Sequence, residues 1–166
     1  MKQICRLCRQ EMAAPSQAAE HAITRGICEA CLSQASGAST YQALLEAIDA
    51  PVLLMQGKPR QVVTANARAL QLFEKELPEV EAHRGGQVFD CVHSFTAAGC
   101  GMDVNCENCT IKHAIVDTFD TPAPRHAAAA VLQVKKHGGL ESRTIRVSTE
   151  KLGDLALVRI ESFDGG

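Results

Sequence analysis

The sequence predicts an α+β fold: a five-stranded antiparallel sheet with helices on one face, joined to a small metal-binding module at the N-terminus. Two observations predict the sheet. The pattern of a strand, a turn, a strand and a helix follows residue 50, and the patterns of three further strands close the chain. A third observation predicts the module. The eight cysteines form two groups of four, separated by 59 residues without a cysteine.

A helix opens the larger part of the chain. Apolar and aromatic residues recur at helical spacing from Tyr41 to Ile48, Thr40 precedes them as a capping residue, and Pro51 ends the pattern. An apolar strand, a Gly-Lys-Pro turn, a second strand and another amphipathic helix follow. We expect these four elements at residues 52–55, 57–59, 61–64 and from residue 66 onward.

The C-terminal part is predicted to contain one helix and three strands. Residues 111–119 carry apolar side chains on one helical face, and Pro122 ends that helix. Alternating apolar and polar residues then indicate antiparallel strands, because successive side chains of a strand point to opposite faces. The strands are expected at residues 128–135, 142–148 and 155–160.

The chain is expected to form two domains. Residues 33–40, SQASGAST, are small and polar and bury little surface, which is typical of a linker. We therefore expect a four-cysteine zinc-binding module, of the ribbon or knuckle type, at residues 1–35, a linker at 36–40, and a larger domain at 41–163 with a cysteine-rich insert at 91–109. A module of about 35 residues buries too little apolar surface to fold alone, so bound metal would contribute folding free energy.

Charge and hydropathy exclude several environments. Lys and Arg total 17 against 19 Asp and Glu, so the net charge of −2 creates no general attraction to nucleic acid or anionic lipid. No apolar run approaches the roughly 18 residues that span a bilayer, and no secretory signal is recognisable, so we expect a cytoplasmic protein that binds no membrane. In a reducing compartment clustered cysteines more often bind metal or perform redox chemistry than form disulfides.

The first cysteine group has the spacing of a tetrahedral zinc site. Two Cys-x2-Cys pairs, separated by 19 residues, can present four thiolates to one ion. Four thiolates leave no position for water, so the site is expected to be structural and not catalytic. Two disulfides or unliganded thiols are the alternatives, and the reducing compartment disfavours the disulfides. The expected zinc ligands are Cys5, Cys8, Cys28 and Cys31.

The second group gathers five candidate ligands within 19 residues: Cys91, His93, Cys100, Cys106 and Cys109. Cys106 and Cys109 are expected on one face of a first helical turn, where free N–H groups favour the thiolate. Zinc and an iron–sulfur cluster both accept four such thiolates, and the sequence does not choose between them. Free cysteines or a reversible disulfide are the alternatives. We expect His93 to support a ligand or to be a solvated side chain, in preference to binding the metal.

The middle of the chain resembles a PAS domain. The segments LLEAIDAPVLLM, QVVTANARALQLF with Asn66, and the ending LQVKK, RTIRVS and LALVRIES follow the PAS order of two strands, helices and three strands over about residues 41–163. The segment VFDCVHSF…GCGMDVNCENCTIKHAI is similar to a cysteine-rich insert in PAS domains of bacterial signalling proteins. The segment GICEACL resembles the second knuckle of small zinc modules that accompany such domains. The resemblance implies signal perception, a homodimer and a signalling protein as partner.

Two functions fit these features. The first is a regulatory module of bacterial signal transduction whose second cysteine group responds to redox state, oxygen or metal supply. The second is a structural interaction module in which both sites bind zinc and nothing is sensed. Nucleic-acid binding is not expected, because one Tyr and no Trp leave little for base stacking. No enzyme is expected either, since phosphate loops, nucleophile elbows and paired catalytic carboxylates are absent from the sequence.

Overall fold

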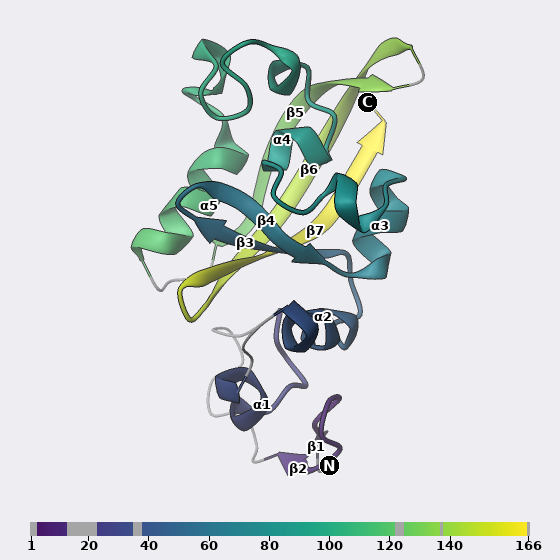
Figure 1. Cartoon of the computed structure of the whole chain (residues 1–166), viewed down its shortest axis with the longest axis vertical. Helices are drawn as coiled ribbons and strands as arrows, with labels where there is room; N and C mark the ends of the chain where they lie inside the picture. Colours follow the sequence, from purple (N-terminus) through teal and green to yellow (C-terminus); the bar gives the residue numbers. More distant parts are fainter. Residues whose placement is uncertain (1–2, 13–22, 35–37, 122–124, 137, 166) are drawn as a thin grey trace.

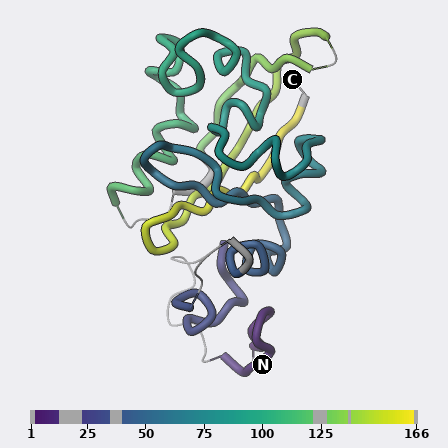
Figure 2. Tube along the Cα trace, viewed as in Figure 1, coloured from purple at the N-terminus to yellow at the C-terminus, as the bar shows by residue number. Residues whose placement is uncertain are grey.

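The computed structural model describes residues 3–12, 23–34, 38–121, 125–136 and 138–165. Its main element is a five-stranded antiparallel sheet with strand order β4-β3-β7-β6-β5 (Figure 1, Figure 2). The strands are β3 (Val52–Gly57), β4 (Arg60–Ala65), β5 (Arg125–Lys136), β6 (Gly139–Leu152) and β7 (Leu155–Gly165). The predicted α+β fold class is confirmed, and each predicted strand overlaps an observed one.

The sheet buries both of its faces at its centre. β3 pairs with β4 on one side and with β7 on the other, so that Leu53 lies opposite Val158. Along β3, Leu53 and Met55 enter one hydrophobic core, whereas Val52 and Leu54 enter another. This alternation follows from the two-residue period of a strand. It explains why β3 is apolar at four successive positions rather than at every second one.

The larger core lies on the face covered by α3 (Ala67–Phe73), α4 (Gly85–Val88) and α5 (Thr110–Asp120) (Figure 1). Three phenylalanines pack together there, with ring centroids 5.1 to 6.3 Å apart: Phe73, Phe89 and Phe163. Short 3-10 helices connect these elements at η1 (Leu77–Glu79), η2 (Val92–Phe95) and η3 (Val104–Cys106). The expected helix at residues 111–119 is α5, and the cysteine-rich insert passes through η2 and η3.

The side chain of Asn66 joins three of these elements. It is fully buried and caps α3, with Oδ1 accepting the N–H groups of Val52 and Ala69 at 3.1 Å each. Its Nδ2 donates to the carbonyls of Leu45 at 3.0 Å and Ala50 at 2.7 Å. One amide therefore uses its donors and acceptor to fix the start of α3 against β3 and against the end of α2 (Ala38–Glu46) and the residues after it.

The second core lies on the opposite face of the sheet. α2 (Ala38–Glu46) contributes Leu44 and Leu45, and the N-terminal segment contributes Cys5, Ile23 and Ile27. That segment contains β1 (Gln3–Ile4), β2 (Glu11–Met12), which pairs with it, and α1 (Glu29–Gln34). The described parts of the expected module, residues 3–12 and 23–34, thus share a hydrophobic core with the sheet.

The expected linker falls partly outside the described residues. Residues 36 and 37 are not described, and α2 already begins at Ala38, two residues before the predicted capping residue Thr40. The small polar stretch therefore contributes its last residues to a helix. Among the described residues, no helix is both long and apolar enough to cross a membrane.

Candidate metal centres

The first cysteine group is carried by two turns. The carbonyl of Cys5 accepts the N–H of Arg9 at 3.0 Å, which closes the turn that presents Cys8. Cys28 immediately precedes α1, and Cys31 lies in the first turn of that helix. The N–H of Cys28 donates to the sulfur of Cys5 at 3.3 Å, so the two turns face each other.

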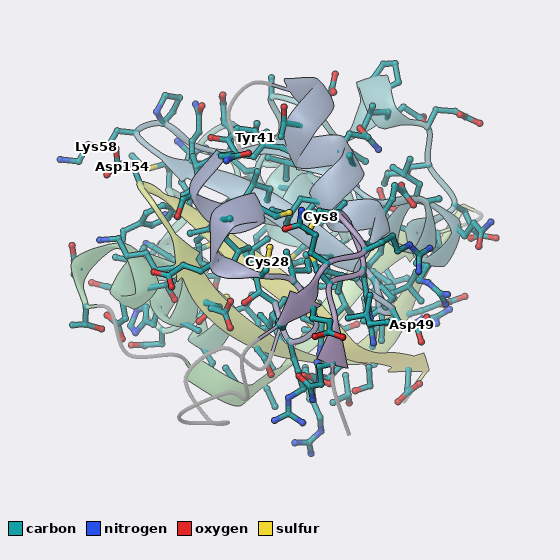
Figure 3. All side chains as sticks on the ribbon, turned by 90° about the horizontal axis from the view of Figure 1, so that it is seen from below. Cys8, Cys28, Tyr41, Asp49, Lys58 and Asp154 are labelled. Atoms are coloured by element: carbon teal, nitrogen blue, oxygen red, sulfur yellow. The ribbon has the colours of Figure 1, made fainter. Side chains whose placement is uncertain are left out.

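The four sulfurs have the spacing of a tetrahedral site. Cys5 and Cys31 have their sulfurs 3.8 Å apart, Cys8 and Cys28 have theirs 3.7 Å apart, and all four lie within 4.8 Å of one another. Zinc–sulfur bonds of about 2.3 Å in a tetrahedron separate the sulfurs by about 3.8 Å. These residues are therefore close enough to hold one metal ion. Figure 3 shows the labelled Cys8 and Cys28 close to the centre of the view from below, near the purple N-terminal ribbon.

The close approach of the cysteines changes the pKa values of Cys5 and Cys31 in opposite directions. Burial alone would raise the pKa of Cys5, but backbone hydrogen bonds from Cys28, Cys8 and Leu7 lower it to about 6. The hydrogen bond with Cys28, burial, and the neighbouring Cys8 and Cys5 raise the pKa of Cys31 to about 12. The thiolate is thus favoured at Cys5, and ionisation of Cys31 is opposed until a cation neutralises the site.

The second cysteine group lines a cavity of about 310 Å³ between α4, α5 and β5. Cys91 is held at the edge of β5 by a bridge to Val134, and the Asp90 carbonyl beside it accepts the N–H of Lys135 at 2.9 Å. Cys109 is the N-cap residue of α5. The four cysteines that line the cavity are Cys91, Cys100, Cys106 and Cys109.

The structure differs from the sequence-based prediction in where it places Cys106 and Cys109. Cys106 ends η3 and Cys109 precedes the first residue of α5, so the two do not share a first helical turn. An intervening Glu107-Asn108 segment separates the two helices because η3 is a short 3-10 turn that does not continue into α5. Within the part of the chain that the structure describes, the first group is the only set of three or more metal-ligating side chains whose ligand atoms converge. The cysteines of the second group instead line the cavity described above.

Glycine backbone approaches Cys100 closely. The N–H of Gly86 in α4 donates to the Cys100 sulfur at 3.1 Å, and a Cβ at position 86 would lie 2.6 Å from that sulfur. Burial raises the pKa of Cys100, while the Gly86 hydrogen bond and the Arg60 guanidinium act in the opposite direction. Burial also raises the pKa of Cys91. Burial therefore favours the neutral thiol at Cys91 and Cys100 unless positive charge enters the cavity.

Cationic side chains surround the Cys100 loop. Arg84 donates to the carbonyl of Cys100 at 3.3 Å, and Lys112 donates to the carbonyl of Gly101 at 2.7 Å. Arg60 and Lys112 line the cavity, and none of the described residues that line it is Asp or Glu. This charge distribution suits a group that carries negative charge on its thiolate ligands.

His93 also lines the cavity, from η2. Its Nδ1 lies 3.8 Å from Oδ1 of Asp103, whose pKa is lowered chiefly by the N–H of Asn105. A protonated His93 therefore has a carboxylate partner on the same loop. The His93 ring therefore lies both at the cavity and beside the Asp103 carboxylate.

Several cavity residues were not anticipated from the sequence. Gly86, Arg60 and Lys112 lie 14, 40 and 12 residues from Cys100, respectively. The Gly85-Gly86 pair was the available signal, since adjacent glycines permit close backbone approach. The two cations carried no such signal, because isolated Arg and Lys residues are ordinary surface residues.

Residues 39–107 match the family model described as PAS domain. The PAS match runs from the start of α2 to just beyond Cys106, and so includes β3, β4 and most of the insert. It covers the first part of the segment 41–163 for which the resemblance was expected.

A similar solved structure is the LOV protein of Rhodobacter sphaeroides. It is 14% identical in sequence and has a TM-score of 0.48, over 72% of this chain. The chain spans 62% of the length of that LOV protein. No curated protein matches the sequence. The PAS match and the α+β fold agree with each other, and neither identifies a metal.

Proposed function

We propose that this chain is a cytoplasmic regulatory PAS module of bacterial signal transduction in which an iron–sulfur cluster occupies the cysteine-lined cavity and zinc occupies the N-terminal four-cysteine site. The cluster would make the module responsive to redox state or oxygen. The observation that carries the proposal is that four cysteines surround one cavity of about 310 Å³ between α5 and the sheet. The proposal is for a regulatory protein and not for an enzyme.

The two cysteine groups differ in a way that favours two different metals. A single ion needs its four sulfurs about 3.8 Å apart. In the N-terminal group two sulfur pairs lie at 3.7 and 3.8 Å, and all four sulfurs lie within 4.8 Å of one another. A cluster contains several metal ions and its thiolate ligands surround it, so it suits cysteines that line a space. The cavity cysteines Cys91, Cys100, Cys106 and Cys109 are the ligands that we propose for the cluster.

The surroundings of Cys100 support a thiolate-bound group. The Gly86 N–H points at the sulfur, and hydrogen bonds to cluster sulfurs are a known means of tuning reduction potential. Arg60 and Lys112 offset the negative charge of the ligands. When bound, the cluster would supply one-electron redox chemistry, and the protein would orient it and limit solvent access.

The response would pass through α5. Cys109 is the N-cap of this helix, and Ile111 and Ile115 contribute to the large core. A change at the cavity therefore acts directly on the first turn of a helix that packs against the sheet.

A signalling protein is the proposed partner, and the chain is proposed to be a homodimer. Light scattering over a concentration series, which should give twice the chain mass, tests the homodimer.

A direct test compares two matched substitutions on protein purified without oxygen. Metal analysis of the unsubstituted chain should give iron, sulfide and one zinc per chain, with broad visible absorbance. Cys106→Ser should remove iron and colour while keeping zinc, and Cys8→Ser should remove zinc while keeping iron. Retention of iron and colour after Cys106→Ser would contradict the assignment of the cavity.

A second candidate function is a zinc-stapled interaction module without sensing. Three large apolar side chains of the insert are exposed by 55% or more, as expected for a surface that contacts another protein: Phe95, Met102 and Val104. Zinc is redox-silent, so this candidate predicts two zinc ions per chain and a colourless protein. The same metal analysis therefore separates the two candidates.

A further inference from the structure

The two cysteine groups lie on opposite faces of the sheet, and two adjacent residues of β6 face them. Glu150 is 4% exposed and points toward the N-terminal module, whereas Thr149 is 1% exposed and points toward α5. Neighbouring residues of a strand face opposite sides of the sheet. A movement of β6 at this point would therefore disturb contacts on both faces of the sheet.

On the module side, Glu150 accepts hydrogen bonds from Thr24 and Ile23. The hydroxyl of Thr24 donates to Oε2 at 2.7 Å, and the N–H of Ile23 donates to Oε1 at 3.3 Å. Thr24 also accepts the N–H of Ile27 at its carbonyl, one residue before the metal ligand Cys28. The buried carboxylate is thus connected to the four-cysteine site through the short segment 24–28.

On the cavity side, Thr149 contacts α5. The hydroxyl of Thr118 lies 2.6 Å from the hydroxyl of Thr149 and 2.7 Å from the carbonyl of Ala114. Ala114 and Thr118 are buried in the helix that Cys109 caps, and Ile115 of the same helix lines the cavity. The contact therefore fixes α5 one turn beyond the cavity wall.

We propose that the N-terminal four-cysteine site and the cysteine-lined cavity are conformationally coupled through Glu150 and Thr149 of β6. A buried carboxylate that loses donors carries a large desolvation penalty, so undocking of residues 23–28 displaces this part of β6 or admits water to it. Either event weakens the Thr118–Thr149 contact and loosens α5. This coupling goes beyond the proposed function and does not require a cluster in the cavity.

Hydrogen–deuterium exchange of the full chain tests the coupling. Cys8→Ser, which weakens the metal site, should unprotect residues 23–34 and also speed exchange in α5 by about tenfold, as expected for increased local opening. Glu150→Gln, which replaces the carboxylate but leaves all cysteines in place, should also speed exchange in both regions. Glu141→Gln on the exposed part of the same strand is the matched control, since the Glu141 carboxylate pairs with the neighbouring Arg143.

The route through α5 is tested by a second pair of variants. Thr118→Val removes the hydroxyl that reaches Thr149, and Thr121→Val removes a hydroxyl that donates to the Asp117 carbonyl at the end of the same helix. Thr118→Val should abolish the effect of Glu150→Gln on α5, and Thr121→Val should preserve it. If residues 23–34 lose protection in Glu150→Gln while α5 exchanges at its original rate, the coupling is wrong. Absence of zinc from the unsubstituted protein would instead overturn the assignment of the four-cysteine site and leave the Glu150→Gln comparison decisive for the coupling.

Discussion

The backbone N–H of Gly86 donates to the sulfur of Cys100 at 3.1 Å, and the two residues approach so closely that a side chain at position 86 has no room. An added Cβ would lie 2.6 Å from the sulfur and 2.9 Å from the Cys100 Cβ. Neither atom is the end of a long flexible side chain. The position of Cys100 in the cavity therefore depends on the absence of a side chain at residue 86.

Gly86→Ala should displace Cys100 from the cavity wall. Overpacking at a buried position destabilises by roughly 1–3 kcal/mol, so we expect a loss of this order in the free energy of unfolding, measured with urea. The variant should also lose iron or other metal from the cavity, as measured by metal analysis. Gly85→Ala is the control, because a Cβ there would meet only Phe89 at 3.5 Å, an ordinary contact.

Metal binding at the four-cysteine site should weaken as the pH falls. Without metal, Cys5 has a pKa of about 6 and is largely a thiolate at pH 7, whereas Cys31 has a pKa of about 12 and is a thiol. Binding must displace the proton of Cys31 at pH 7, and below pH 6 it must also displace that of Cys5. Zinc affinity measured by chelator competition should therefore decrease from pH 8 to pH 7 and more steeply below pH 6. An affinity independent of pH over this range would contradict thiolate ligation.

Local sequence patterns predicted the sheet because β3 is a short apolar run, the later strands alternate between apolar and polar residues, and each hairpin turn contains a glycine or proline. Asn66 was correctly associated with the start of a helix, since capping depends on residues only three positions away. The Cys-x2-Cys pairs likewise encode their own turns, and the four N-terminal cysteines converge as their spacing suggested. Short-range patterns were thus sufficient to predict most of the secondary structure and the first cysteine group.

The contacts that define the cavity and the module interface could not be predicted in this way. Glu150 meets Thr24 across 126 residues of sequence, and nothing in either neighbourhood signals the pairing. α4 has the sequence GGQV, whose two glycines disfavour a helix, so only its tertiary surroundings explain it. The cysteines of the insert were recognised as a group, but their arrangement around a space depends on α4, α5 and β5 together.

Asn66→Ala should be among the most destabilising substitutions in the chain. It removes the acceptor for two N–H groups and the donors for two carbonyls; the Asn66 side chain is fully buried, and only its bond to the Ala50 carbonyl is partly exposed. Leaving buried polar groups without partners costs about 1–3 kcal/mol each, and we expect a total loss of at least about 3 kcal/mol by urea denaturation. Asn108→Ala, at an exposed position, should change the free energy of unfolding by less than about 0.5 kcal/mol. Equal effects of the two substitutions would contradict this role of Asn66.

His93→Ala distinguishes a metal ligand from a side chain that supports the site. His93 lines the cavity and faces Asp103 at 3.8 Å, while four cysteines already supply a complete ligand set. We therefore expect His93→Ala to retain the metal content of the cavity but to change the reduction potential, because a side chain near the ligands has been removed. Asp103→Asn is the companion variant, since it alters the partner of His93 while keeping the ring. Loss of metal in His93→Ala with full retention in Cys91→Ser would show instead that His93 is the ligand and Cys91 is not.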